Sequence, residues 1–210
     1  MADNYLEKRM EDFRAQPTKP TKRAANLEKL LRRNRSYRGY DPSFEVREDQ
    51  LRRIVAVNTL IPSARNSQAL RFRLVTRNEA HKVLPHIRLG GALPHLHLPY
   101  PGTQPEAFIV VMSAIEPDNY IYIDLGISAQ SMLLQAVEIG LNGICIGAFD
   151  AKAVSEAFDL RYEPVLILAI GRGADKIRLK EIGEEEDHRY YRKDGIHYVP
   201  KVCVEDLILK

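Results

Sequence analysis

The stretch Tyr120–Asp150, which reads YIYIDLGISAQSMLLQAVEIGLNGICIGAFD, carries the strongest fold signal in the chain. No Asp, Glu, Lys or Arg occurs between Gly126 and Val137, whereas a helix on a protein surface normally carries a polar stripe. The pattern therefore predicts a long helix that is buried on nearly every face, in a core or at an interface. Asp124 and Glu138 interrupt the apolar run, which argues against a membrane span of about 20 mostly apolar residues.

The residues after this helix predict a turn and then a short strand. Residues 140–143, Gly-Leu-Asn-Gly, tolerate positive φ and so favour the end of the helix. Residues 144–149 then predict a buried strand that ends in the small residues Gly147 and Ala148. Bare backbone at such a place can approach a ligand closely. Cys145 is flanked by isoleucines, and by itself it is typical of a small buried hydrophobe.

Working outward, the remaining apolar patterns predict a mixture of helices and strands. Continuous apolar runs at 107–115 and 164–171 predict strands buried on both faces. Without strict βαβ repetition, we expect an α+β fold of three layers in one domain over residues 23–210, preceded by an N-terminal helical extension and linker over residues 1–22. The other predicted elements are helices at 4–15, 24–33, 48–60, 78–88 and 151–159, a strand at 71–77, a long loop at 89–105 and an exposed charged segment at 172–188.

Composition narrows the class of protein. A chain of 210 residues is long enough for one domain with a sizeable core, and a net charge of +3 is too small to indicate nucleic-acid binding. Met1–Asn4 shows no secretory signal, and Cys145 and Cys203 lie far apart, so we expect a reduced, cytoplasmic protein. The close pair His95 and His97 lacks a third ligand in register, so no metal site is predicted.

Two polar clusters are candidates for binding. Arg35-Ser36-Tyr37-Arg38 offers two guanidinium groups and a hydroxyl, which suit a phosphate-bearing small molecule. A solvated basic turn is the commoner explanation of such a run, and nucleic-acid binding is disfavoured because no further basic stripe follows. The second cluster, Ser63, Asn66 and Gln68, could bind the edge of a heterocycle, or its side chains could cap their own turn.

The order of these features resembles the nitroreductase family of FMN-dependent flavoproteins. Arg-Ser-x-Arg-x-Tyr at 35–40 is followed by Pro-Ser-Ala-x-Asn-x-Gln at 62–68, then by the apolar helix that leads to Gly147-Ala148-Phe149-Asp150, and finally by Pro200-Lys201. The resemblance covers the chain from about residue 30 to residue 210. It implies a three-layer α/β/α sandwich with a mixed, mainly antiparallel central sheet. It also implies a domain-swapped homodimer that holds FMN at its interface, with no nucleic-acid or membrane partner.

The resemblance also implies a role for individual residues. Arg35 and Ser36 would bind the phosphate or ribityl chain of FMN, and Arg38 would reach the pyrimidine edge of the flavin. The remaining implied cofactor-binding residues are Pro62, Ser63, Asn66 and Gln68 from the other subunit, Gly147 and Ala148 with their backbone at flavin N5, Cys145 beside the pocket, and Lys201 near the phosphate.

The implied activity is a ping-pong transfer of hydride from NADH or NADPH through flavin N5 to a nitro compound, a quinone or a similar acceptor. No side chain is assigned a catalytic role, because the flavin carries the chemistry. The alternative is a flavin-binding protein without nicotinamide-driven turnover, such as a sensor, a storage protein or an FMN-consuming relative. A basic protein that binds nucleic acid through residues 32–38 is a third hypothesis.

Overall fold

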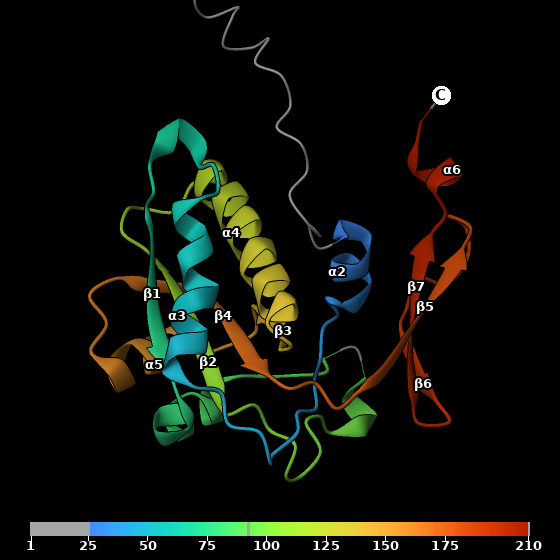
Figure 1. Ribbon diagram of the computed structural model, residues 1–210, viewed down its shortest axis with the longest axis horizontal. Helices are drawn as coiled ribbons and strands as arrows, with labels where there is room; N and C mark the ends of the chain where they lie inside the picture. The colour runs from blue at the N-terminus through green and yellow to red at the C-terminus, as the bar shows by residue number, and fades with distance from the viewer. Residues whose placement is uncertain (1–25, 92, 210) are drawn as a thin grey trace, which may run out of the picture.

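The computed structural model describes residues 26–91 and 93–209 of the chain (Figure 1). The predicted extension and linker, including the helix expected at 4–15, lie outside the described residues. The helices are α2 (Leu27–Arg33), α3 (Glu48–Val55), α4 (Asn119–Glu138), α5 (Ala151–Phe158) and α6 (Val204–Leu207). The strands are β1 (Leu70–Val75), β2 (Ala107–Ser113), β3 (Asn142–Ile146), β4 (Glu163–Gly171), β5 (Lys176–Ile182), β6 (Tyr191–Lys193) and β7 (Ile196–Val202).

The central sheet has four strands in the order β1-β2-β4-β3, and every neighbouring pair is antiparallel. The prediction of a mixed sheet is therefore wrong for these four strands. Within this sheet, among the described residues, a parallel contact occurs at the outer edge of β3, where Ser36 forms an isolated bridge with Gly143. Neither edge of the sheet is closed by a further strand of the described chain, although residues 36–37 cover part of the β3 edge.

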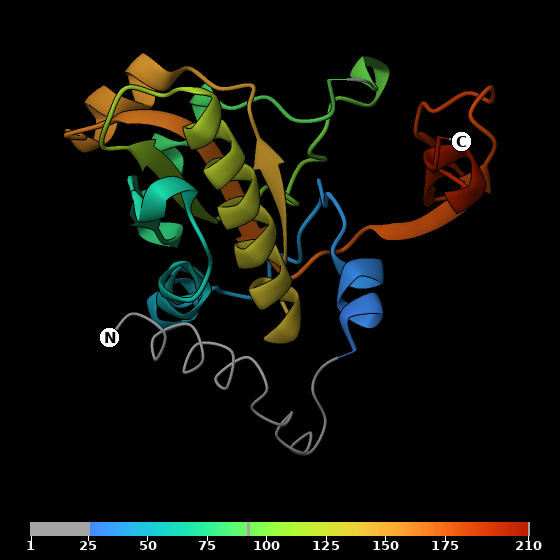
Figure 2. The same ribbon diagram turned by 90° about the horizontal axis from the view of Figure 1, so that it is seen from above.

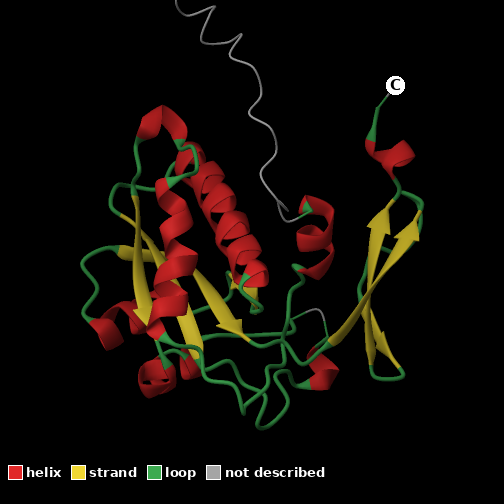
Figure 3. Ribbon diagram, viewed as in Figure 1, coloured by secondary structure: helices red, strands yellow, loops and turns green. Residues whose placement is uncertain are grey.

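Helices cover both faces of this sheet. Side chains of α3 and α4 pack with Ile109 and Val111 of β2 on one face. Val154 of α5 and the turns at residues 77–86 pack with Phe108 and Val110 on the other. Because β2 sits between two cores, alternate residues such as Phe108 and Ile109 are both fully buried. The predicted α+β class and three-layer arrangement are thus confirmed (Figure 3).

Helix α4 begins after Asp118, whose carboxylate accepts a hydrogen bond from the backbone N–H of Ile121. Its inner face is buried, but Tyr122 and Ile123 on the outer face are 57% and 58% exposed. Within a single chain, therefore, α4 is not buried on nearly every face as predicted, since the described residues leave its outer face uncovered. No helix in the described part of the chain is long and apolar enough to cross a membrane.

The segment that was predicted only as exposed and charged contains a strand. Residues 174–209 form a C-terminal arm, in which β5, β7 and β6 make a second sheet with β5 and β7 parallel. The arm stands beside the sandwich and is joined to it after β4 (Figures 1 and 2). Most side chains of β5 are exposed, so no buried period marked this strand in the sequence.

Three other boundaries differ from prediction. β3 ends at Ile146, so Gly147 and Ala148 lie beyond the strand. The helix predicted at 48–60 is α-helical only to Val55 and continues as a 3₁₀ turn over Ala56–Thr59. The helix predicted at 78–88 consists of 3₁₀ turns, Arg77–Lys82 and Leu84–His86.

Candidate functional site

The basic motif runs along the open edge of β3. The backbone N–H of Tyr37 donates to the carbonyl of Gly143 at 3.3 Å, next to the bridge that Ser36 makes with the same glycine. A Cβ at Gly143 would lie 2.6 Å from the Leu133 side chain and 2.7 Å from the Ala169 carbonyl oxygen. Glycine at this position therefore lets α4, β3 and β4 pack closely beneath the motif.

Two tyrosines of the motif anchor it to the end of β4. Tyr37 and Tyr40 pack against Gly173 and Gly171, where any Cβ would meet their rings at 2.2 Å and 2.5 Å. The Tyr40 hydroxyl donates to the carbonyl of Tyr37 at 3.1 Å. Burial raises the pKa of Tyr40 far above its ordinary value, so the phenol stays neutral. The motif is thus part of a packed structure, which a solvated basic turn would not require.

Asp175 connects the motif to the C-terminal arm. Its carboxylate accepts hydrogen bonds from the backbone N–H groups of Arg38 at 2.8 Å and Gly39 at 3.0 Å. It also accepts a bond from the Arg192 guanidinium at 2.7 Å, and the side chain of Asp175 is only 8% exposed. Sequence reasoning missed Asp175, because an acid beside a basic strand has no distinctive local pattern.

A cavity of about 310 Å³ lies between the motif, α4, β3 and the arm. Three cationic side chains face it, and no Asp or Glu among the described residues lines it. Such a cavity favours an anionic ligand. Its lining residues are Asn34, Arg35, Ser36, Arg38, Gln130, Leu133, Gly143, Cys145, Ile177, Tyr190, His197, Val199 and Lys201.

The guanidinium groups of this cationic cavity have unused hydrogen-bonding capacity. Arg38 lies over the ring of Tyr190, 4.7 Å from its centroid, and donates to the carbonyl of Ser36 at 3.1 Å. Arg35 donates to the carbonyl of Leu31 at 2.6 Å, and burial lowers its pKa. The Nε atoms of both arginines are buried without a hydrogen-bond partner among the described residues. Buried donors of this kind normally have an acceptor, which a ligand in the cavity would supply.

His197 of β7 forms another part of the cavity wall that the sequence did not reveal. It is 3% exposed, and its ring lies 5.1 Å from that of Tyr190. Its Nδ1 is buried without a partner in the described chain. Burial, and then the positive charges of Arg38 and Arg192, lower the pKa of His197 to about 4. The imidazole is therefore neutral near pH 7.

The second predicted cluster is a separate turn at residues 62–68, held by α4. The buried carboxylate of Asp124 accepts from the backbone N–H of Ala64 at 2.9 Å and from the Ser67 hydroxyl at 3.4 Å. The Ser63 hydroxyl accepts from the backbone N–H of Gln68 at 3.2 Å, so it caps its own turn. The Gln68 amide donates to the carbonyl of Asn66 at 3.4 Å.

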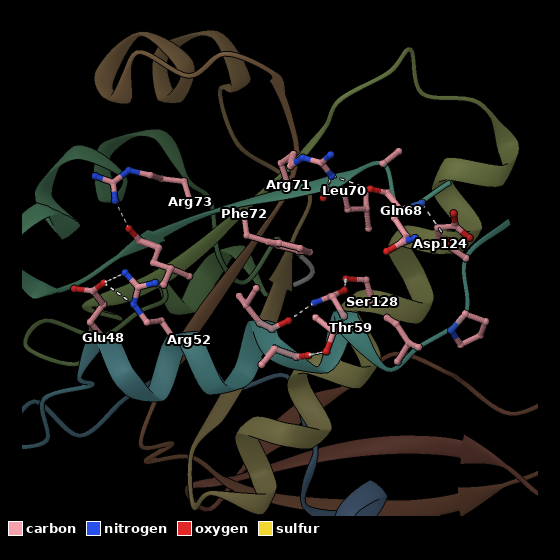
Figure 4. Close-up of a pocket in the computed structure, with 18 of the residues that line it drawn as sticks. Glu48, Arg52, Thr59, Gln68, Leu70, Arg71, Phe72, Arg73, Asp124 and Ser128 are labelled. Atoms are coloured by element: carbon pink, nitrogen blue, oxygen red, sulfur yellow. Dashed lines mark hydrogen bonds and ion pairs between the residues drawn. The ribbon is translucent and has the colours of Figure 1, made fainter. Parts of the chain in front are cut away.

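This turn borders a larger cavity of about 680 Å³ between α3 and β1 (Figure 4). Pro62, Ser63 and Gln68 line it, and Asn66 lies in the same turn. The two cavities share no lining residue. Within one chain, therefore, the structure does not bring the motif at 35–38 and the turn at 62–68 into a single pocket.

The small residues after β3 form a third, exposed site. A Cβ at Gly147 would meet nothing within 4 Å, so the space beside it is open. The carbonyl of Ala148 accepts from the backbone N–H of Arg88 at 2.9 Å. The expectation that Cys145 is a buried hydrophobe is wrong, because it is exposed on the cavity wall. Partial desolvation there raises the pKa of its thiol, which disfavours a nucleophilic thiolate.

Comparison of the sequence with known proteins points to one family. Residues 96–172 match the model of the nitroreductase family. The chain is also 25% identical to "Putative NAD(P)H nitroreductase YdgI" of Bacillus subtilis (strain 168), over 70% of this chain and 88% of that protein. This chain resembles the nitroreductase family. The resemblance predicted from its motifs is confirmed.

The chain has the nitroreductase fold, as three solved structures show. A nitroreductase family protein from Streptococcus pneumoniae TIGR4 has a TM-score of 0.61 and 16% identity, over 88% of this chain and 100% of that one. The structure of "a putative nitroreductase in complex with FMN", from Exiguobacterium sibiricum 255-15, has a TM-score of 0.60 and 20% identity, over 74% of this chain and 92% of that one. Another FMN complex, from Desulfovibrio desulfuricans, has a TM-score of 0.59 and 22% identity, over 72% and 88%.

Proposed function

We propose that this chain is an FMN-dependent oxidoreductase that uses NADH or NADPH to reduce an oxidised acceptor such as a nitro compound or a quinone. The observation that carries the proposal is the cationic cavity, in which Arg35, Arg38 and Lys201 face one space without a carboxylate in its described lining. The unpartnered Nε atoms of the two arginines fit a ligand that brings several acceptor oxygens. Two of the similar solved structures hold FMN.

The residues of the cavity would divide the binding of FMN between them. Arg35, Ser36 and Lys201 supply two cations and a hydroxyl for the phosphate or ribityl chain. Arg38, fixed through its backbone by Asp175 and through its guanidinium by the Tyr190 ring, places a positive charge for the pyrimidine edge. A fixed cation at that edge stabilises negative charge that develops there on reduction.

When bound, FMN supplies the hydride chemistry at its N5 atom. The backbone of Gly147 and Ala148 would border that atom, because the open space beside Gly147 accommodates a ring. Backbone groups at that place fix the ring without adding a titratable side chain. Cys145 would contribute to the pocket wall in its protonated form.

We further propose a homodimer in which the turn at 62–68 of one subunit completes the cationic cavity of the other. Three uncovered features support this arrangement: the outer face of α4 at Tyr122 and Ile123, the free edge of β1, and apolar side chains near the C-terminus. Leu207 and Leu209 are 67% and 92% exposed, which favours burial against a second copy. Light scattering after size-exclusion chromatography tests this directly, since a monomer at micromolar concentration would contradict it.

The function is tested by the absorbance spectrum of the pure protein, reconstituted with FMN and freed of excess. We expect bound-flavin bands that bleach under anaerobic NADH or NADPH and return on addition of a quinone or nitro compound. A protein that binds FMN but is bleached by neither nicotinamide would support the alternative of a flavin-binding protein without turnover. A protein that binds no FMN would overturn both.

A further inference from the structure

His197 is the one imidazole in the lining of the cationic cavity, and charged groups surround it on three elements. Within the arm its neighbours in the sheet are Ile177 of β5 and Arg192 of β6. Asp175, just before β5, pairs with Arg192, and the positive charge of Arg38 acts on the imidazole from the motif. The Tyr190 ring packs against the imidazole at a tilt of 57°, with the ring centroids 5.1 Å apart.

Other titratable groups face the same cavity at its walls. Lys201 lies four residues further along β7, Arg35 lies in the motif, and the Cys145 thiol projects from β3. Positive charge therefore outweighs negative charge around the imidazole, with Asp175 as the acid in contact with this network. A proton on His197 in the empty cavity would add a further cation to a crowded, poorly hydrated place.

A bound anion reverses this electrostatic effect, so that the protonated imidazole becomes favoured. A phosphate monoester bound by Arg35 and Lys201 would bring negative charge into the cavity and so offset the positive charges that keep the imidazole neutral. It would also offer acceptor oxygens to a ring that is 97% buried and whose Nδ1 has no partner in the described chain. A charged hydrogen bond from imidazolium to phosphate is stronger than a bond from neutral imidazole.

We propose that His197 is a ligand-binding residue of this cavity that takes up a proton when a phosphate monoester binds and then donates a hydrogen bond to it. The proton comes from solvent and forms an N–H bond on the imidazole, and no other covalent bond is made or broken. The identity of the ligand as FMN rests on the proposed function, whereas the response of His197 to a bound phosphate is additional to it.

The proposal fixes the direction of a pH dependence. The pKa of His197 is about 4 in the free protein and is raised in the complex, so between the two values the complex holds one more proton. Affinity for FMN then rises as the pH falls through that interval, by at most about tenfold per pH unit for one proton. Riboflavin, which has the same ring and ribityl chain without the phosphate, should show no such rise.

The experiment is calorimetric titration of FMN into the full chain at pH 6.5, in two buffers that differ in enthalpy of ionisation. The difference in heat gives the number of protons taken up. Because free FMN phosphate itself titrates near this pH, the informative quantity is wild type minus His197→Asn. We expect greater uptake by the wild type, and no such difference between the wild type and His188→Asn, an exposed histidine outside the cavity.

The outcomes separate the two proposals. Equal proton uptake by the wild type and His197→Asn would overturn the role of His197 and leave FMN binding intact. Failure of the wild type to bind FMN would overturn the proposed function instead. Should His197→Asn not fold, ¹⁵N-histidine NMR of the wild type decides: addition of FMN should move the ring nitrogens of one buried histidine to imidazolium shifts, and unchanged neutral shifts would contradict the proposal.

Discussion

The two polar clusters of this chain, the motif at 35–38 and the turn at 62–68, were both binding candidates in the sequence, and they differ in structure. In the motif, buried Nε atoms of Arg35 and Arg38 have no partner among the described residues. In the turn, Ser63 and Gln68 bond to the backbone of their own turn. A ligand would therefore stabilise the motif more than the turn, because each buried donor without a hydrogen bond costs about 1–3 kcal/mol.

The electrostatics of the two clusters differ in the same sense. Cations line the motif's cavity without a carboxylate in the described lining, whereas the turn is held by the buried carboxylate of Asp124. The comparison indicates that the motif provides positive charge for a ligand, whereas the turn forms a rigid part of a cavity wall. A change in the motif should therefore alter binding, and a change at Asp124 should alter folding first.

The substitution Arg38→Ala should have the largest effect, and that effect is on ligand binding. Loss of a charge-assisted contact should weaken FMN binding by about tenfold to a hundredfold and shift the reduction potential of the bound flavin to a more negative value. Fluorescence titration and a redox titration measure the two quantities. Arg161→Ala, whose guanidinium lies over the ring of Tyr162, is the matched control. Wild-type affinity and potential in Arg38→Ala would remove the proposed role of the motif.

The next effect is on stability, by Asp124→Ala. The substitution leaves the Ala64 N–H without its acceptor and empties a buried position in α4, so the free energy of unfolding should fall by about 1–3 kcal/mol. Urea unfolding measures this, with Asp187→Ala as the control, since Asp187 forms an exposed pair with Arg189. If unfolding is unchanged, the turn is not held by α4 and the contrast between the clusters fails.

The layers of the fold could be predicted from sequence because buried elements leave long runs of residues without charge. Apolar runs at β2 and β4 and the uncharged centre of α4 were each visible, and the structure places all three in the core. The arm carries no such apolar run: β5 alternates charged and apolar residues only over Lys176–Lys180, and most of its side chains are exposed. β5 pairs with residues of β7 that lie 20 positions further along the chain, and no local pattern reports such a pairing.

Local sequence patterns identified only part of the candidate site as well. Arg35, Ser36 and Arg38 could be named because they are adjacent in sequence, and Lys201 because its Pro-Lys context resembles the family. Tyr190 and His197 line the cavity, and Asp175 binds the backbone of the motif, only because the arm packs there, so their roles emerge from tertiary packing. The apolar outer face of α4 was predicted to be buried in a core or at an interface, and the structure shows that the covering surface does not lie in the described part of the same chain.

The smallest expected effect, about 1 kcal/mol, concerns the stability of the unliganded protein at mildly acidic pH. The pKa of His197 is lowered from 6.5 to about 4 on folding, so the unfolded chain binds more protons between these values. The contribution to stability is intact above about pH 7.5, begins to be lost as the pH falls through 6.5, and is fully lost below 4. Between pH 7.5 and 5.5 the loss from this one group is about 1 kcal/mol.

Urea unfolding of the wild type and His197→Asn at pH 7.5 and 5.5 isolates that loss, because other titrating groups are common to both proteins. The difference in unfolding free energy between the two pH values should be smaller in the variant, while His188→Asn should behave as the wild type. Saturating FMN should also abolish the wild-type loss, since the bound phosphate favours the protonated imidazole. If the loss persists unchanged with FMN bound, His197 is a buried packing residue and the motif's cavity binds its anion through Arg35, Arg38 and Lys201 alone.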